Sequence, residues 1–196
     1  EPRRAINFYE QALSISRENI DRQLEGSCLG NLGLAYSYLD EPRKAIDFYE
    51  QALAIAREIS DRRLEETCLG HLGIVYSRLG KFQRAIEFYE QALQISPEIG
   101  DKRTEGAWLG NLGIAYLYLG EFQRAIEFFE RALEISREIR YLLLEGNQLF
   151  NMSLALQALG KGKKAIPLAK SALAIYEQIG SSDAEAVRKE LAEWGA

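Results

Sequence analysis

Residues 61–100 read DRRLEETCLGHLGIVYSRLGKFQRAIEFYEQALQISPEIG, and the same pattern recurs on both sides of this stretch. Repeating units occupy 21–60, 61–100, 101–140 and 141–180, with no insertion or deletion between them. A fixed period of this kind indicates a repeat protein, in which each unit covers its apolar faces by packing against its neighbours. A partial unit flanks the array on each side. Residues 1–20 match the second half of a unit, and residues 181–196 begin a divergent later unit.

Each unit contains two stretches with the hydrophobic spacing of a helix. In the first stretch of 21–60, Leu29, Leu32 and Tyr36 fall on one face, and in the second Ala45 and Tyr49 do so. No segment has the alternation of a strand, so the sequence predicts an all-α solenoid of helix pairs. Aspartates at helix starts and glycines after the first helices mark the expected boundaries, and these are Asp21, Asp61, Asp101, Gly80, Gly120 and Gly160.

The last full unit departs from the pattern. Ser153 replaces a glycine of the first helix, and Pro167 is expected to interrupt the second helix near its start. Ser182 and Glu185 have the spacing of a capping box that opens one more helix. Terminal units of solenoids are commonly atypical because one side of them meets water. We therefore expect residues 141–196 to form the C-terminal end of the array, closed by a capping helix over 181–196.

A family resemblance follows from these residues. Leu29-x-x-Leu32-Gly33-x-x-Tyr36, followed by Ala45-x-x-x-Tyr49, resembles the tetratricopeptide repeat (TPR) signature, whose usual unit has about 34 residues. The longer variety found here resembles the repeats of Pins/LGN polarity adaptors and of bacterial NB-ARC or STAND signalling ATPases. The resemblance implies a right-handed superhelical solenoid of antiparallel helix pairs that binds proteins or peptides through its inner wall. The signature recurs at Leu69, Leu72, Gly73, Tyr76, Ala85, Tyr89 and Ala92, and again at Leu109, Leu112, Gly113, Tyr116, Ala125, Phe129 and Ala132, while Pro97 stands where the family often ends its second helix.

One stripe of the first helices is not needed for packing, and it pairs an amide row with an apolar row. An asparagine offers both a donor and an acceptor to a peptide backbone, and leucine or isoleucine beside it supplies apolar burial. The expected peptide-binding residues are Asn31, Leu34, Tyr38, His71, Ile74, Arg78, Asn111, Ile114, Tyr118, Asn151 and Leu154. The same stripe also includes Ser27, Thr67, Ala107, Asn147 and Ala158.

Individual positions of the stripe have separate expected roles. Tyr38 and Tyr118 would add aromatic area with a polar tip, and Arg78 would pair with an acidic side chain of the ligand. Gly30, with Gly70 and Gly110, would leave the wall open to a peptide backbone. The alternative is that the asparagines only bridge neighbouring first helices and touch no ligand. The carboxylate clamp of chaperone-binding repeats is not expected, because the inner wall lacks the basic residues it needs.

Several other functions are disfavoured by composition. A net charge of −5 argues against nucleic-acid binding, and no apolar run is long enough to cross a membrane. His71 is the only histidine, so we expect no metal site, no cofactor and no catalytic pair, and hence no enzyme. Cys28 and Cys68 occupy equivalent positions in successive repeats, about 10 Å apart, which is too far for a disulfide. Both are expected to be buried thiols of a cytoplasmic protein.

Two functions remain for the chain. The first is a protein- or peptide-binding module that serves as the sensor or adaptor region of a larger signalling protein. The second is a structural spacer or self-association element with no ligand in its groove. The chain opens in the middle of a unit, as though excised from a longer protein, so helix 1–20 would leave Ile6, Tyr9 and Leu13 partly uncovered. Copies are expected to associate through that helix.

Overall fold

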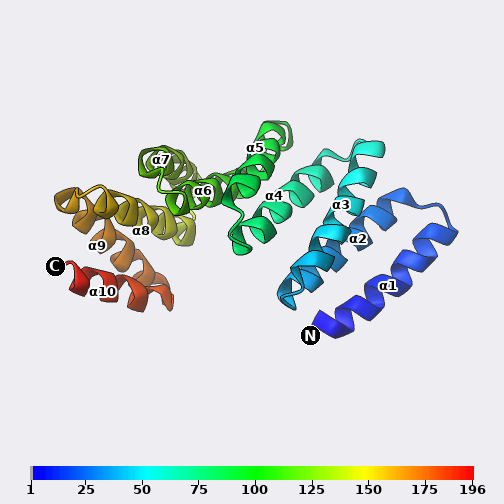
Figure 1. Cartoon of the computed structure of the whole chain (residues 1–196), viewed down its shortest axis with the longest axis horizontal. Helices are drawn as coiled ribbons and strands as arrows, with labels where there is room; N and C mark the ends of the chain where they lie inside the picture. Colours follow the sequence, from blue (N-terminus) through cyan, green and yellow to red (C-terminus); the bar gives the residue numbers. More distant parts are fainter. Residues whose placement is uncertain (1) are drawn as a thin grey trace. The chain divides into compact units, whose positions relative to one another are not determined.

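The computed structural model describes residues 2–196, and within them it contains ten α-helices and no β-strand (Figure 1). The all-α prediction is confirmed, and each full repeat forms one pair of helices. The helices are α1 (Pro2–Glu18), α2 (Arg22–Tyr38), α3 (Pro42–Glu58), α4 (Arg62–Arg78), α5 (Phe82–Ile99), α6 (Lys102–Tyr118), α7 (Phe122–Glu138), α8 (Leu142–Ala158), α9 (Gly162–Ile179) and α10 (Asp183–Glu193).

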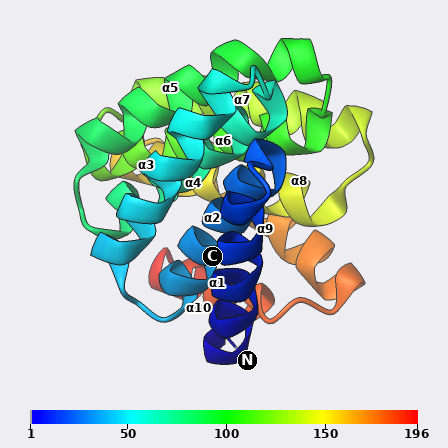
Figure 2. The ribbon, with the colours of Figure 1, turned by 90° about the vertical axis from the view of Figure 1, so that its right-hand side faces the viewer.

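The helices are grouped in two units, unit 1 (Glu1–Gly100) and unit 2 (Asp101–Ala196). Within each unit every helix packs on the next one, and the first helices of successive repeats also contact each other, α2 with α4 and α6 with α8. Figure 2 looks onto α1, which lies in front of α2. The first helices of each unit therefore lie side by side. A single continuous, right-handed solenoid through both units stays a prediction.

Helix starts and ends follow the expected capping residues. The Oδ1 atoms of Asp21 and Asp61 accept hydrogen bonds from the N–H groups of Leu24 and Leu64, both at 3.0 Å. Asp101 caps α6 in the same way. These bonds satisfy backbone donors that have no partner inside the helix. After the first helices of the later repeats the chain adopts positive φ, which glycine permits, at Gly80, Gly120 and Gly160.

The repeat core depends on a small residue facing a large one. The ring of Phe129 fills the space beside Gly113, where a Cβ atom would lie 2.5 Å from the ring. Tyr49 does the same beside Gly33, where that distance would be 2.8 Å. In the fourth repeat Ser153 stands in the glycine position and Ala169 in the ring position, and both are fully buried. A larger residue on one helix is therefore matched by a smaller one on the other.

Buried ion pairs join successive repeats. The side chain of Glu65 is only 9% exposed, and it accepts hydrogen bonds from Arg57 of the preceding helix at 2.9 Å and from Arg62 at 2.6 Å. Glu25 is held in the same way, and the hydrogen bond from Arg17 is the main reason that its pKa is lowered. Two guanidinium groups thus compensate the cost of burying each carboxylate.

Two local expectations are wrong, the interruption at Pro167 and the capping box at Ser182, although α10 does begin directly after Ser182. Pro167 does not interrupt α9, which runs through it, because this exposed residue lies in the second turn and removes only one helical N–H donor. Pro97 likewise lies inside α5, which continues to Ile99. The capping box does not form, since Ser182 makes no side-chain cap. Instead the hydroxyl of Ser181 accepts a hydrogen bond from the N–H of Asp183 at 3.2 Å.

Of the three apolar residues of α1 that were expected to be partly uncovered, only Tyr9 is half-buried. Ile6 and Leu13 are each only 7% exposed, because they lie in the interface with α2. Phe8 and Ile15, at 59% and 54%, are the exposed apolar side chains instead. The equivalent of Phe8 in the next repeat, Phe48, stacks on a tyrosine of its own first helix, and no first helix precedes α1 within residues 2–196.

Candidate functional site

The pocket between α2 and α4, here called the α2–α4 pocket, has a volume of about 230 Å³. Helix α2 contributes the predicted residues Ser27, Asn31 and Leu34, which follow one another by about one turn. Helix α4 contributes the predicted residues Thr67 and His71. Gly30 also lines the pocket, as expected. The residues that sequence reasoning missed are Tyr49, Leu64 and Cys68.

A buried phenol lines the α2–α4 pocket. Tyr49 is 1% exposed, and its hydroxyl has no hydrogen-bond partner within residues 2–196. Its ring stacks on the imidazole of His71, with ring centroids 5.4 Å apart and an interplanar angle of 6°. Burial raises the pKa of Tyr49 and lowers the pKa of His71, so both are neutral near pH 7. The wall of the α2–α4 pocket therefore contains an uncharged, buried hydroxyl that has no hydrogen-bond partner within residues 2–196.

The two cysteines have no role in chemistry that the geometry supports. Both Cys28 and Cys68 are buried free thiols, in agreement with the prediction. Burial raises the pKa of the Cys68 thiol to about 12, which suppresses the reactive thiolate at neutral pH. Although Cys68 lines the α2–α4 pocket, it acts there as a small apolar side chain.

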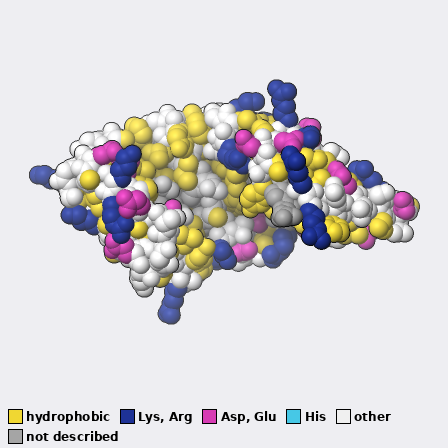
Figure 3. All heavy atoms as spheres, turned by 90° about the horizontal axis from the view of Figure 1, so that it is seen from below, with side chains coloured by type: hydrophobic (Ala, Val, Ile, Leu, Met, Phe, Trp, Pro, Cys, Tyr) yellow, Lys and Arg dark blue, Asp and Glu magenta, His cyan; other side chains and the backbone are white. Residues whose placement is uncertain are grey.

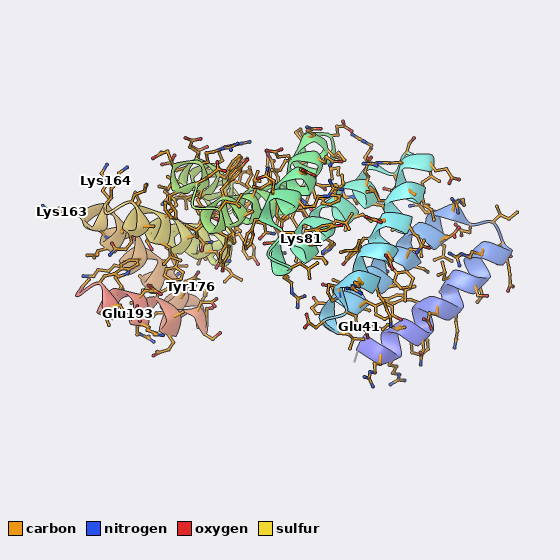
Figure 4. The ribbon with its side chains drawn as sticks, viewed as in Figure 1. Glu41, Lys81, Lys163, Lys164, Tyr176 and Glu193 are labelled. Atoms are coloured by element: carbon orange, nitrogen blue, oxygen red, sulfur yellow. The ribbon has the colours of Figure 1, made fainter. Side chains whose placement is uncertain are left out.

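A larger pocket lies between α6 and α8, here called the α6–α8 pocket, with a volume of about 400 Å³. Helices α9 and α10 close it on one side, through Tyr176 and through Asp183 with Ala186. Figure 4 labels Tyr176 on α9, the helix that packs on both α8 and α10. Predicted stripe residues in this pocket are Ala107, Asn111, Ile114, Asn147 and Asn151, and the residues that were missed are Leu144, Gln148, Phe150, Tyr176, Asp183 and Ala186.

Two hydrogen-bonding groups distinguish the α6–α8 pocket. The hydroxyl of Tyr176 donates to Oδ1 of Asn147 at 2.7 Å. Burial, and secondarily the charge of Asp183, raises the pKa of that phenol to about 12. Gln148 is 2% exposed, and its Oε1 has no hydrogen-bond partner within residues 2–196. A buried amide oxygen without a partner is a candidate ligand contact.

The expected role of Gly110 is wrong. Its missing side chain does not open the wall to a peptide, because the amide of Gln148 occupies that space. A Cβ atom at position 110 would lie 2.7 Å from Nε2 of Gln148. At Gly30 the same atom would meet only Leu64, at 3.6 Å, so that part of the wall is open.

The asparagine row lies at the pockets and not in sealed helix interfaces. Asn31 is exposed, and Asn111 and Asn151 are half-buried. None of the three side chains makes a hydrogen bond within residues 2–196, so they do not bridge neighbouring first helices. Their amide donors and acceptors line the α2–α4 and α6–α8 pockets, where they are available to a partner.

The remaining predicted residues lie outside these two pockets. Tyr38 and Tyr118 are 74% and 67% exposed at the ends of α2 and α6, while Ile74 and Leu154 are half-buried. Arg78 donates hydrogen bonds to Asp40 at 3.1 Å and to the carbonyl oxygen of Ser37 at 3.0 Å. An acidic ligand would have to displace these partners. Ligand contact at all of these positions stays a prediction.

The surface shows no strongly basic region on the face seen in Figure 3, where Lys and Arg side chains are interspersed with Asp and Glu. Many charged side chains of this protein form ion pairs, such as the one between Arg62 and Glu98 at 2.9 Å. A search of residues 2–196 finds no group of three or more His, Cys, Asp or Glu side chains that could hold a metal ion. Within the same residues, no helix has the length and apolar character that spanning a bilayer requires.

Comparison with known sequences gives one family. The family model described as tetratricopeptide repeat matches residues 2–58, 52–98 and 65–138, which together span most of the chain. A search of curated proteins found no match. The family match rests on the first three repeats and leaves the divergent fourth repeat outside it.

Solved structures share the fold. BtubC (BKLC) from P. vanneervenii has a TM-score of 0.84 and 25% sequence identity, over 91% of this chain and 74% of that chain. A STAND protein with a tetratricopeptide repeat sensor, from Pyrococcus horikoshii, has a TM-score of 0.84 and 23% identity, over 96% and 29% of the two chains. The Rap conjugation gene regulator of plasmid pLS20, in complex with a Phr peptide, has a TM-score of 0.70 and 19% identity, over 92% and 50%.

Proposed function

Because this chain belongs to the tetratricopeptide repeat family, we propose that it is a protein-interaction module that holds a segment of a partner chain along its first helices. The segment, extended or helical, would lie over the α2–α4 and α6–α8 pockets. We also propose that the module acts as the sensor or adaptor region of a larger cytoplasmic signalling protein. It has no catalytic role in this proposal.

A single observation carries the proposal. Three equivalent asparagines, Asn31, Asn111 and Asn151, present side-chain amides that are not used inside the fold. Beside them, Leu34 and Ile114 expose part of their apolar surface to the pockets. An amide row next to an apolar row matches a peptide, which offers backbone polar groups and side chains in alternation.

The similar structures support an interaction role without defining the ligand. One of them carries its repeats as the sensor of a STAND protein, and another was solved with a bound Phr peptide. Their low identity to this chain supports a shared fold, and function varies among proteins of one fold. The proposal for this chain therefore rests on its own pocket residues.

Selection of ligands from a random-sequence displayed peptide library tests the proposal. The Asn31→Ala, Asn111→Ala double variant should bind the selected peptides at least about tenfold more weakly than the unmodified protein, because each lost amide removes hydrogen bonds worth about 1 kcal/mol. The matched control is Gln51→Ala, Glu134→Ala, which alters exposed positions on the second helices. Selected peptides that bind the double variant as tightly as the unmodified protein would refute the proposal.

The alternative function is that of a spacer or self-association element. The exposed Phe8 and Ile15 of α1 favour it, since they form an apolar face that a second copy can cover. Light scattering over a concentration series separates the two functions. The alternative is excluded if the protein is a monomer at every concentration and still selects peptides. It is favoured if the protein selects no peptide and forms a dimer that the Phe8→Ser, Ile15→Ser double variant does not form.

A further inference from the structure

We infer that the α6–α8 pocket receives a basic side chain, above all arginine, of the bound segment. This inference rests on the proposed function and adds a chemical preference to one subsite. It starts from the charges that line the pocket. Asp183 is the only charged residue among the lining side chains, so the pocket carries one negative charge and no positive charge.

Asp183 is not neutralised within the fold. It forms no ion pair within residues 2–196, and its only side-chain hydrogen bond there comes from the hydroxyl of Ser181, to Oδ2 at 2.7 Å. Arg188 of α10 pairs with other carboxylates, with Glu177 of α9 at 2.8 Å and with Glu185 at 3.0 Å. A cation from a partner can therefore contact Asp183 without first displacing an arginine or lysine of this chain.

Besides Asp183, the lining residues include acceptors that suit a cation with several donors. Oε1 of Gln148 is buried and has no partner within residues 2–196. Oδ1 of Asn147 accepts one hydrogen bond, from the Tyr176 hydroxyl at 2.7 Å. A carbonyl-type oxygen can accept a second hydrogen bond. A guanidinium carries five N–H donors in one plane and can serve a carboxylate and an amide oxygen together.

The apolar part of the lining suits the rest of an arginine side chain. Leu144 is 7% exposed and Ile114 is half-buried, and both belong to the lining of the pocket. Such residues cover the methylene stem of a long basic side chain while the charged end reaches the polar groups. The pocket volume of about 400 Å³ accommodates one such side chain together with part of the backbone that carries it.

A second round of the library selection tests the inference. Peptides selected on the unmodified protein should be enriched in arginine or lysine at one position, and this enrichment should vanish when the selection is repeated on Asp183→Asn. For one selected peptide, replacing that arginine by citrulline, which keeps the shape and removes the charge, should weaken binding about tenfold or more. In Asp183→Asn the arginine and citrulline forms should bind equally. The control is Glu185→Gln, which removes an equal charge from α10 outside the pocket lining.

The outcomes separate this inference from the proposed function. The inference is overturned if the selected peptides depend on Asn31 and Asn111 but show no preference for a basic residue. It is also overturned if that preference persists in Asp183→Asn. In both cases the proposed function stands. A failure to select peptides, or selected peptides that ignore the asparagines, refutes both. If Asp183 only caps α10, its substitution will lower the melting temperature but leave the ratio of arginine to citrulline affinities unchanged, which also overturns the inference.

Discussion

The α2–α4 and α6–α8 pockets occupy the same place in two pairs of repeats, yet their polar groups come from different helices. Both have an asparagine and an aliphatic residue at equivalent positions of the first helix. In the α2–α4 pocket the buried group without a partner is the hydroxyl of Tyr49, from α3. In the α6–α8 pocket it is the amide oxygen of Gln148, from α8.

The repeat positions show how this difference arises. The equivalent of Tyr49 in the third repeat is Phe129, which has no hydroxyl, and the equivalent of Gln148 in the second repeat is Cys68. Only the α6–α8 pocket has a charged residue in its lining, Asp183. The packing pattern therefore determines where each pocket lies, whereas residues outside that pattern determine which chemical groups it can hold.

The largest expected effect comes from removing the ring that lines the α2–α4 pocket. Tyr49→Ala should lower the free energy of unfolding by about 3–5 kcal/mol, because a ring that is 1% exposed leaves a cavity beside Gly33. Urea unfolding followed by circular dichroism measures the loss.

The fourth repeat indicates how part of that loss can be recovered. There Ser153 and Ala169 stand in the positions of Gly33 and Tyr49. Adding Gly33→Ser to Tyr49→Ala should restore about 1 kcal/mol, whereas Gly33→Ser alone should be destabilising because its side chain meets the ring. Equal effects of Gly33→Ser in both backgrounds would show that the two positions are independent.

The next effect contrasts two equivalent glycines. Gly30→Ala should stabilise unit 1 by about 1 kcal/mol, because alanine favours a helix and its Cβ makes only an ordinary contact with Leu64. Gly110→Ala should give a net loss of up to about 2 kcal/mol, because its Cβ collides with the amide of Gln148. Thermal unfolding of the two variants provides the measurement. Stabilisation of both would show that Gln148 moves away easily.

Much of this architecture follows from local patterns in the sequence. Helical spacing, the cap at Asp61 and the glycine at Gly80 mark the helix boundaries. The stripe of residues that helix packing does not need includes Asn31 and Asn111, which line the pockets. Those features depend on residues close in the chain, so the sequence displays them directly.

Other features depend on contacts between distant segments, which no local pattern shows. Tyr49 was assigned correctly to the core, but its second role at the pocket depends on where α4 lies. Gln148 and Asp183 come together only because α8 and α10 both reach the α6–α8 pocket. The pairing of Arg57 with Glu65 likewise requires the packing of α3 on α4.

A pH dependence should separate the two pockets. Burial lowers the pKa of His71 below its ordinary value of 6.5, so as pH falls through that value the unfolded chain binds a proton before the folded one does. Stability should therefore decrease from about pH 7 to about pH 5, with a slope from this group of at most about 1.4 kcal/mol per pH unit.

The variant His71→Asn, which carries the asparagine of the equivalent position 31, should remove that part of the slope. The pKa of Glu25 is already lowered from 4.5, so this carboxylate titrates below the chosen range. Urea unfolding at several pH values gives the comparison. A slope that is the same in both proteins would mean that His71 titrates normally in the fold.

The smallest effect tests whether the two buried phenols differ as their surroundings indicate. Tyr176→Phe should cost about 1 kcal/mol of stability, because it removes the hydrogen bond to Asn147. Tyr49→Phe should be neutral or slightly stabilising, because its hydroxyl is buried without a partner within residues 2–196 and Phe129 already fills the equivalent site. If that hydroxyl serves a ligand, the same Tyr49→Phe variant should bind selected peptides more weakly while unfolding at the same or a higher urea concentration. A loss of stability at Tyr49 equal to that at Tyr176 would instead indicate an ordered water on the hydroxyl, and the contrast between the two pockets would then lie in Asp183 alone.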